Sequence, residues 1–143
     1  MTMKKIIIFG ATGNVGSYVH KYACEYFKDR YEVIASGHRQ TDFFEKQGQK
    51  YVSVDISKAE EFDKLPQEDI YAVIDLAAQI PSYMKGYQPE KYVKSNIMGA
   101  YNVLEYCRKV HADRILFSTT VFDISLSATN GAVLKPDMPY NFS

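Results

Sequence analysis

The sequence predicts an α/β fold in which helices cover both faces of a parallel, doubly wound β-sheet. Short β-branched runs alternate with stretches of helix-spaced apolar residues through most of the chain. A glycine-rich turn at residues 10–16 separates the first such run from the first helical stretch. The 143 residues suit one domain, and the contents of 46% hydrophobic and 24% charged residues are ordinary for a globular protein. With right-handed crossovers we expect five strands in the order 3-2-1-4-5.

The first third of the chain contains two strands with a helix between them. Residues 5–9 form a β-branched run that ends at Gly10, which is typical of a buried parallel strand. Residues 14–28 carry apolar side chains at helical spacing, and residues 32–36 form a second strand that Gly37 interrupts. This order predicts the beginning of a β-α-β unit.

The middle of the chain predicts a third strand flanked by two short helices. Thr41 is suited to cap the first of these helices, which we expect to end near residue 47. Residues 51–54 form the third strand. Ser57 and Glu60 have the spacing of a capping box for the second helix, which we expect Pro66 to terminate.

The last third of the chain predicts two strands around the longest helix. Residues 70–76 form the fourth strand, and Pro89 suits the first turn of a helix that runs to about His111. Residues 115–117 begin a fifth strand. From residue 123 to residue 143 the alternating pattern ends, so we expect an irregular tail there.

The longest helix carries two apolar stripes. The first, which we expect to face the sheet, consists of Val93, Ile97, Ala100, Leu104 and Cys107. The second, which we expect a partner helix to cover, consists of Asn96, Gly99, Val103 and Val110.

The charge balance and the first residues exclude several classes of protein. Lys plus Arg equals Asp plus Glu at 17 each, which argues against an electrostatic nucleic-acid surface. The apolar run at residues 5–9 is too short for a membrane span or a signal-peptide core, so we expect a cytoplasmic protein. Cys24 and Cys107 are expected to be buried thiols in a reducing compartment, and no residues have metal-ligand spacing.

The strongest functional signal is the glycine-rich turn Gly-Ala-Thr-Gly-Asn-Val-Gly at residues 10–16. Glycine permits the tight turn and the close approach of a pyrophosphate, and the helix that follows offers unpaired N–H groups and the positive end of its dipole. In this strand–turn–helix context the motif predicts a dinucleotide cofactor, held by Gly10, Thr12, Gly13, Asn14, Val15 and Gly16.

The residues after the second strand bear on which dinucleotide is bound. NAD is usually held by an acidic residue about 20 positions beyond the glycines. Here the count from Gly16 reaches Ser36-Gly37-His38-Arg39, which contains no carboxylate. Arg39 is suited to the 2′-phosphate of NADP, with His38 a weaker candidate, so we expect NADP with NAD as the alternative. The other interpretation of Arg39 is a solvated loop residue.

Two further pairs of residues follow the third and fourth strands. Asp55 and Ile56 are placed to meet the adenine ring, the carboxylate at its amino group and the aliphatic chain on its face. Asp55 is equally suited to cap the turn that follows it. Ala77 and Ala78 are small where the backbone passes close to the cofactor.

Together these features resemble the extended short-chain dehydrogenase/reductase family, the NAD(P)-dependent epimerases and dehydratases. The resemblance covers roughly residues 4–122 and is carried by residues 10–16, Asp55-Ile56, Asp75-Leu76-Ala77-Ala78, the helix segment 96–104 and the strand end 117–122. It implies a Rossmann-type cofactor domain at residues 1–122, followed by the tail at residues 123–143. It also places Asn96, the first residue of the helix signature, among the cofactor-site residues.

The resemblance implies a mechanism in which nicotinamide exchanges a hydride and a Tyr–Lys pair exchanges a proton. A Ser or Thr at the end of the fifth strand would hydrogen-bond the reacting oxygen, and Ser118, Thr119 and Thr120 all remain candidates for it. The only Tyr-x-x-x-Lys here, Tyr87 to Lys91, lies upstream of the longest helix, and we interpret it as coincidence. We therefore expect the catalytic pair and the substrate region to be absent from this chain.

Two functions follow as alternatives. The first is the NAD(P)-binding portion of an oxidoreductase or epimerase that acts on a small molecule, with a sugar nucleotide as the expected substrate. The second is a non-catalytic NADP-sensing or regulatory module on the same fold. We also expect a homo-oligomer, or a tail at residues 123–143 that folds back over the edge of the sheet, because the apolar fifth strand and the second helix stripe would otherwise be uncovered.

Overall fold

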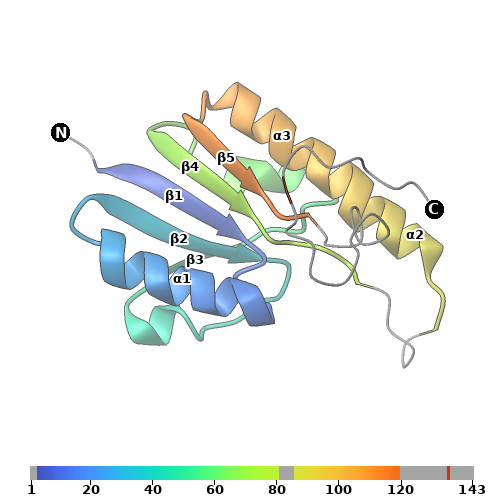
Figure 1. Cartoon of the computed structure of the whole chain (residues 1–143), viewed down its shortest axis with the longest axis horizontal. Coiled ribbons are helices and arrows are strands. Elements are labelled where there is room, and N and C mark those ends of the chain that lie inside the picture. Colours follow the sequence, from blue (N-terminus) through green and yellow to red (C-terminus); the bar gives the residue numbers. More distant parts are fainter. Residues whose placement is uncertain (1–2, 81–85, 120–134, 136–143) are drawn as a thin grey trace.

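The five predicted strands form one parallel sheet in the order β3-β2-β1-β4-β5, which confirms the predicted fold class (Figure 1). The structure is a computed structural model that describes residues 3–80, 86–119 and 135. The predicted tail, residues 123–143, lies outside the described residues except for residue 135. The strands are β1 (Lys4–Phe9), β2 (Tyr31–Gly37), β3 (Lys50–Ser53), β4 (Ile70–Asp75) and β5 (Arg114–Phe117).

Helices lie on both faces of this sheet (Figure 1). One face is covered by α1 (Asn14–Phe27). The other is covered by a long helix made of three consecutive parts: α2 (Pro89–Tyr92), the π-helical segment η4 (Val93–Gly99) and α3 (Ala100–Lys109). Two short 3-10 helices, η1 (Glu45–Gln47) and η2 (Ala59–Lys64), flank β3 in the chain.

The sheet separates two hydrophobic cores. Successive residues of a strand point to opposite faces, so Ile8 and Ala35 pack on the α1 side and Ile7 and Ile34 pack on the side of the long helix. All four side chains are fully buried. This burial on both faces explains why β1 and β2 are continuous apolar runs in the sequence.

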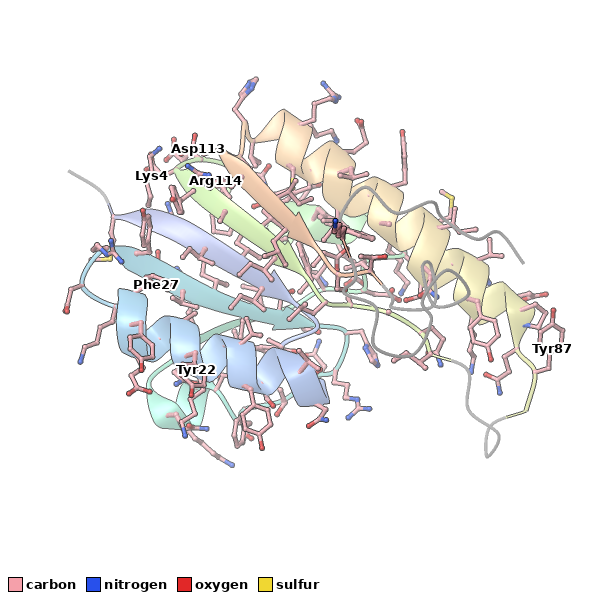
Figure 2. The ribbon with its side chains drawn as sticks, viewed as in Figure 1. Lys4, Tyr22, Phe27, Tyr87, Asp113 and Arg114 are labelled. Carbon is pink, nitrogen blue, oxygen red and sulfur yellow. The ribbon has the colours of Figure 1, made fainter. Side chains whose placement is uncertain are left out.

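The buried side of α1 is formed by Gly16, His20 and Ala23. Tyr22 and Tyr26, which the sequence places in the helix-spaced apolar set, are instead exposed and stack on each other. Figure 2 shows Tyr22 on α1 among the side chains of this face of the molecule. A histidine therefore occupies the core position that the apolar spacing would assign to a hydrophobic residue.

The long helix corrects the predicted assignment of its two stripes. Val103 and Val110, from the stripe expected to lie away from the sheet, are buried in the core on the sheet together with Tyr106, and Gly99 is buried against Ile56. Val93, Ile97 and Leu104, expected to face the sheet, are exposed, whereas Cys107 from the same stripe packs against the core as expected. Val103 and Leu104 are neighbours within the regular helix α3, so the stripe that packs on the sheet is decided by how the helix is turned against it.

The predicted capping box at Ser57 is also wrong. The hydroxyl of Ser57 donates to Asp55 Oδ1 at 2.7 Å instead of capping η2, and no side chain caps that helix in the described part of the chain. Glu61, not Glu60, reaches back, and its carboxylate accepts a hydrogen bond from the backbone N–H of Asp55 at 2.8 Å. The first short helix is reduced to η1, although the Thr41 hydroxyl does accept a bond from the N–H of Phe43.

Candidate functional site

The carboxyl ends of all five strands meet at one edge of the sheet, and the predicted site residues follow them there. Backbone hydrogen bonds continue across this edge beyond the strands. Ala11 N donates to Ser36 O at 3.0 Å, Leu76 N to Phe9 O at 3.2 Å, and Ser118 N to Asp75 O at 3.1 Å. The loops after β1, β2, β4 and β5 are thus tied together. In open α/β sheets ligands bind at this edge.

The glycine-rich turn requires glycine at two of its positions for reasons of space. Gly10 has a φ of +76°, and a Cβ there would lie 2.8 Å from Ala77 N and from Leu76 O. A Cβ on Gly16 would lie 2.0 Å from Gly10 O. The turn therefore packs backbone to backbone against the end of β4 and the start of α1, which leaves its outer side open to a ligand.

The first turn of α1 faces this open side. The helix begins at Asn14, and its N-cap residue Gly13 provides no side-chain cap. Gly13, Asn14 and Val15 are exposed, while Thr12 is half-buried against Gly37. The N–H groups that begin a helix and the positive end of its dipole, placed at an exposed glycine turn, fit a pyrophosphate. Thr12, Gly13, Asn14 and Val15 are the residues that would hold it.

The loop after β2 places His38 and Arg39 in solvent beside this turn. Both residues are exposed, and β2 ends at Gly37. The hydroxyl of Tyr51, from β3, donates to Gly37 O at 2.9 Å and also contacts Arg39 O. The preceding hydroxyl, Ser36 Oγ, is fully buried and has no hydrogen-bond partner within the described part of the chain. Sequence reasoning included neither Ser36 nor Tyr51 in the site.

Asp55 acts as a cap in this structure. Its Oδ1 accepts hydrogen bonds from the N–H of Ser57 at 3.1 Å and from the Ser57 hydroxyl at 2.7 Å. Ile56 is buried against the long helix, where a Cβ on Gly99 would lie 2.6 Å from its Cδ1. The amide of Asn102, also on the long helix, donates to Ile56 O at 2.8 Å. The loop after β3 is therefore fixed to that helix.

The end of β4 carries a buried carboxyl group. Asp75 is 2% exposed, and its Oδ1 accepts a hydrogen bond from Ala77 N at 3.0 Å. Burial raises the pKa of Asp75, and the bond from Ala77 opposes that rise. Ala77 is half-buried and Ala78 is exposed. The small residues at 77 and 78 therefore follow a turn that the Asp75 carboxyl group holds together.

Asn96 lies in the π-helical segment and pairs with the chain beyond β4. Its Oδ1 accepts a hydrogen bond from Gln79 N at 2.7 Å, and its Nδ2 donates to Gln79 O at 3.0 Å. The side-chain amide thus satisfies both backbone groups of Gln79, as a neighbouring strand would. In this structure the side chain of Asn96 holds the backbone of Gln79 beside the site.

The candidate catalytic hydroxyls lie at the same edge of the sheet. Ser118 and Thr119 directly follow β5 and are exposed. Thr120 lies outside the described residues. Tyr87, the first residue of the Tyr-x-x-x-Lys spacing, is 85% exposed at the outer end of α2 (Figure 2).

The described residues contain neither a metal-binding cluster nor a membrane-spanning helix. Within residues 3–80, 86–119 and 135, no three His, Cys, Asp or Glu side chains gather as they would around a metal ion. No helix in those ranges is long and apolar enough to cross a membrane.

The sequence matches the NAD dependent epimerase/dehydratase family over residues 6–141. It is 21% identical over 132 residues to an uncharacterized protein of Methanocaldococcus jannaschii, a match that covers 84% of this chain and 40% of that protein. The chain therefore spans less than half the length of this relative.

Solved structures of dehydrogenases and epimerases share the fold. Uronate dehydrogenase from Agrobacterium tumefaciens superposes with a TM-score of 0.72 at 20% identity, covering 99% of this chain and 49% of that one. UDP-glucose 4-epimerase from Thermus thermophilus, solved in complex with NAD, gives 0.75 at 22% identity, covering 96% and 44%. At such identities the likeness establishes the fold.

Proposed function

The chain belongs to the NAD-dependent epimerase/dehydratase family, and on that premise we propose that it binds NADP at the carboxyl edge of its sheet. The glycine turn carries this proposal, because Gly10 and Gly16 pack without room for a side chain and the first turn of α1 is left exposed. Two of the similar structures were solved with NAD: the Thermus epimerase and a mutant of the Agrobacterium uronate dehydrogenase.

The preference for NADP over NAD rests on the loop after β2. Sequence positions 36–39 provide no carboxylate for a ribose 2′-hydroxyl, whereas Arg39 provides an exposed guanidinium. A guanidinium can form two parallel hydrogen bonds with a phosphate. Arg39, with His38 beside it, is therefore the group that would hold a 2′-phosphate.

The reaction we propose is that of an epimerase, dehydratase or related reductase acting on a sugar nucleotide, with this chain as its cofactor-binding portion. The nicotinamide would supply hydride exchange when bound. Ser118 or Thr119, exposed at the end of β5, would hydrogen-bond the reacting oxygen of the substrate. No Tyr-x-x-x-Lys follows Ser118 in this sequence, so we expect the chain alone to bind cofactor without turnover.

We also propose a cytoplasmic setting, where the free thiols of Cys24 and Cys107 would stay reduced.

Calorimetric titration of the chain with NADP and NAD tests the proposal. We expect NADP to bind more tightly, and Arg39→Ala to lower NADP affinity about tenfold or more while leaving NAD nearly unchanged. Equal affinities, or tighter binding of NAD, would contradict the NADP preference.

A charge placed at the glycine turn tests the site itself. Asn14→Asp introduces a carboxylate at the exposed start of α1, where it suits the helix dipole but repels a pyrophosphate. We expect weaker binding of both cofactors and no loss of thermal stability. Ser17→Asp, which places the same charge further along the helix, is the matched control and should change binding less.

A further inference from the structure

The loop that carries Arg39 is held by a tyrosine from the neighbouring strand. Tyr51 Oη donates to Gly37 O at 2.9 Å and also contacts Arg39 O. A phenol has one proton to donate, so the two carbonyls share it. Because these carbonyls lie on either side of His38, the chain from Gly37 to Arg39 bends around the hydroxyl.

The position of that hydroxyl is set by the core. The ring of Tyr51 stacks on Phe44, with centroids 5.0 Å apart and planes inclined by 5°. Phe44 is 3% exposed and meets the edge of His20, on α1, at a centroid distance of 5.0 Å. Burial raises the pKa of Tyr51 despite a hydrogen bond with the Ser53 side chain and the charge of Arg39, which both lower it, so the hydroxyl keeps its proton at neutral pH. The hydrogen-bond donor is thus fixed in place by packing beneath the loop.

A side chain at position 37 would have little room. A Cβ at this position would lie 2.9 Å from Thr12 Oγ1, 3.2 Å from Thr12 Cγ2 and 3.4 Å from Tyr51 Oη. Gly37 is the last residue of β2, where an acidic residue would otherwise reach the ribose of NAD. The Thr12 side chain therefore crowds a side chain at position 37, while Tyr51 Oη would lie in ordinary van der Waals contact with it.

We propose that Tyr51 is a positioning residue that sets the cofactor preference of this site. Its hydroxyl holds the backbone of residues 37–39, while Thr12 crowds an acidic side chain at position 37. Arg39 is then the first charged side chain after β2 that can meet a 2′-phosphate. This inference rests on the proposed binding of NADP.

Tyr51→Phe tests the role of the hydroxyl, because it removes the hydrogen bonds and keeps the ring on Phe44. We expect the affinity for NADP to fall about 2- to 10-fold and the affinity for NAD to stay within about twofold, so that the ratio between them falls. In the Arg39→Ala background the same substitution should have no further effect on NADP, because Tyr51 acts through Arg39.

Tyr106→Phe is the matched control. Tyr106 Oη also donates to a backbone carbonyl, that of Pro66, but it lies on the long helix away from the β2 loop. Its loss should leave the NADP-to-NAD ratio unchanged. Thermal unfolding of each variant establishes that the ratios are measured on folded protein.

The outcomes separate this inference from the proposed function. If Arg39→Ala weakens NADP but Tyr51→Phe does not, NADP binding stands and the positioning role is wrong. If Tyr51→Phe weakens NADP and NAD equally, Tyr51 supports the fold of the site and does not set its preference, which also overturns the inference. A wild-type chain that binds neither cofactor overturns both proposals.

Discussion

Asp75 illustrates how a single buried residue at the site affects the stability of the fold. Its carboxyl group lies at the end of β4, 2% exposed, and burial raises its pKa above the value of 3.8 expected in water. Cys107 lies close enough that burial first, and then the charge of Asp75, raise the pKa of its thiol to about 11. Both raised pKa values reflect the poor hydration of these side chains, which lie beneath the edge of the sheet.

The raised pKa of Asp75 predicts a pH-dependent effect on stability. The unfolded chain releases this proton near pH 3.8 and the folded chain at higher pH, so the free energy of unfolding falls as pH rises through that interval. Asp75→Asn keeps an oxygen to accept the Ala77 N–H and removes the charge. We expect it to raise Tm at pH 7 by about 4 °C and to change Tm little at pH 3.5.

Thermal unfolding of both proteins at the two pH values measures this difference. A gain that is equal at pH 7 and pH 3.5 would show that charge burial is not its cause. A loss of stability at pH 7 would show that the charged carboxylate is favoured in this pocket, contrary to the prediction.

At the scale of elements, the long helix packs on the sheet and also holds a loop at the edge of the sheet. The π-helical segment ends at Gly99, and from there Val103, Tyr106 and Val110 continue the buried face. Gly99 itself lies against Ile56, and Asn102 binds the carbonyl of Ile56. The helix thereby holds the loop after β3 at the cofactor edge.

The contact between Gly99 and Ile56 predicts that the effect of Gly99→Ala on the free energy of unfolding changes sign when Ile56 is also replaced. A Cβ on Gly99 would lie 2.6 Å from Ile56 Cδ1 and 2.7 Å from its Cγ1. Gly99→Ala alone should therefore lower the free energy of unfolding by about 1–3 kcal/mol through overpacking. In an Ile56→Ala background the same change should be neutral or stabilising, because alanine favours a helix over glycine by about 1 kcal/mol.

Denaturant unfolding of the four proteins in the cycle gives the coupling between the two positions. Equal effects of Gly99→Ala in both backgrounds would show that the close contact is relieved by a small movement of the helix. In that case the helix does not fix the loop after β3 through this contact.

At the scale of the whole molecule, apolar surface gathers beyond β5. Ile115, Leu116 and Phe117 are 42%, 55% and 51% exposed, and β5 is the edge strand of the sheet in the described part of the chain. Val93, Ile97 and Leu104 add exposed apolar side chains from the long helix. Charged side chains gather at the amino ends of β1 and β5, where Lys4 and Asp113 form an ion pair at 2.6 Å near Arg114 (Figure 2).

The exposed apolar side chains of this edge strand predict that the 143-residue chain self-associates through β5. Exposed apolar side chains on an edge strand with free backbone groups favour pairing with another chain. We expect a dimer or larger species in sedimentation velocity, and Leu116→Lys should shift it toward monomer. A wild-type monomer whose β5 amides exchange rapidly with solvent would show that the edge is tolerated.

Local sequence determined the order of the elements and the cofactor edge. Strands buried on both faces need continuous β-branched runs, and the glycine turn must lack side chains at Gly10 and Gly16, so both features are visible in the residues themselves. The parallel topology then brings the strand ends together, which is why the candidate site could be predicted from positions far apart in the chain.

Only the tertiary structure decided which side chains act through contacts between elements. Sequence spacing does not identify His20 as a core residue, because its burial depends on Phe44. It does not place Tyr51 in the site either, because the hydrogen bonds of Tyr51 reach carbonyls at and beyond the end of a different strand. The choice between the two helix stripes depended on how the long helix is turned against the sheet, which spacing along the chain does not reveal. Spacing along a chain reports which face of an element is apolar, whereas packing between elements depends on how they are turned and where they meet.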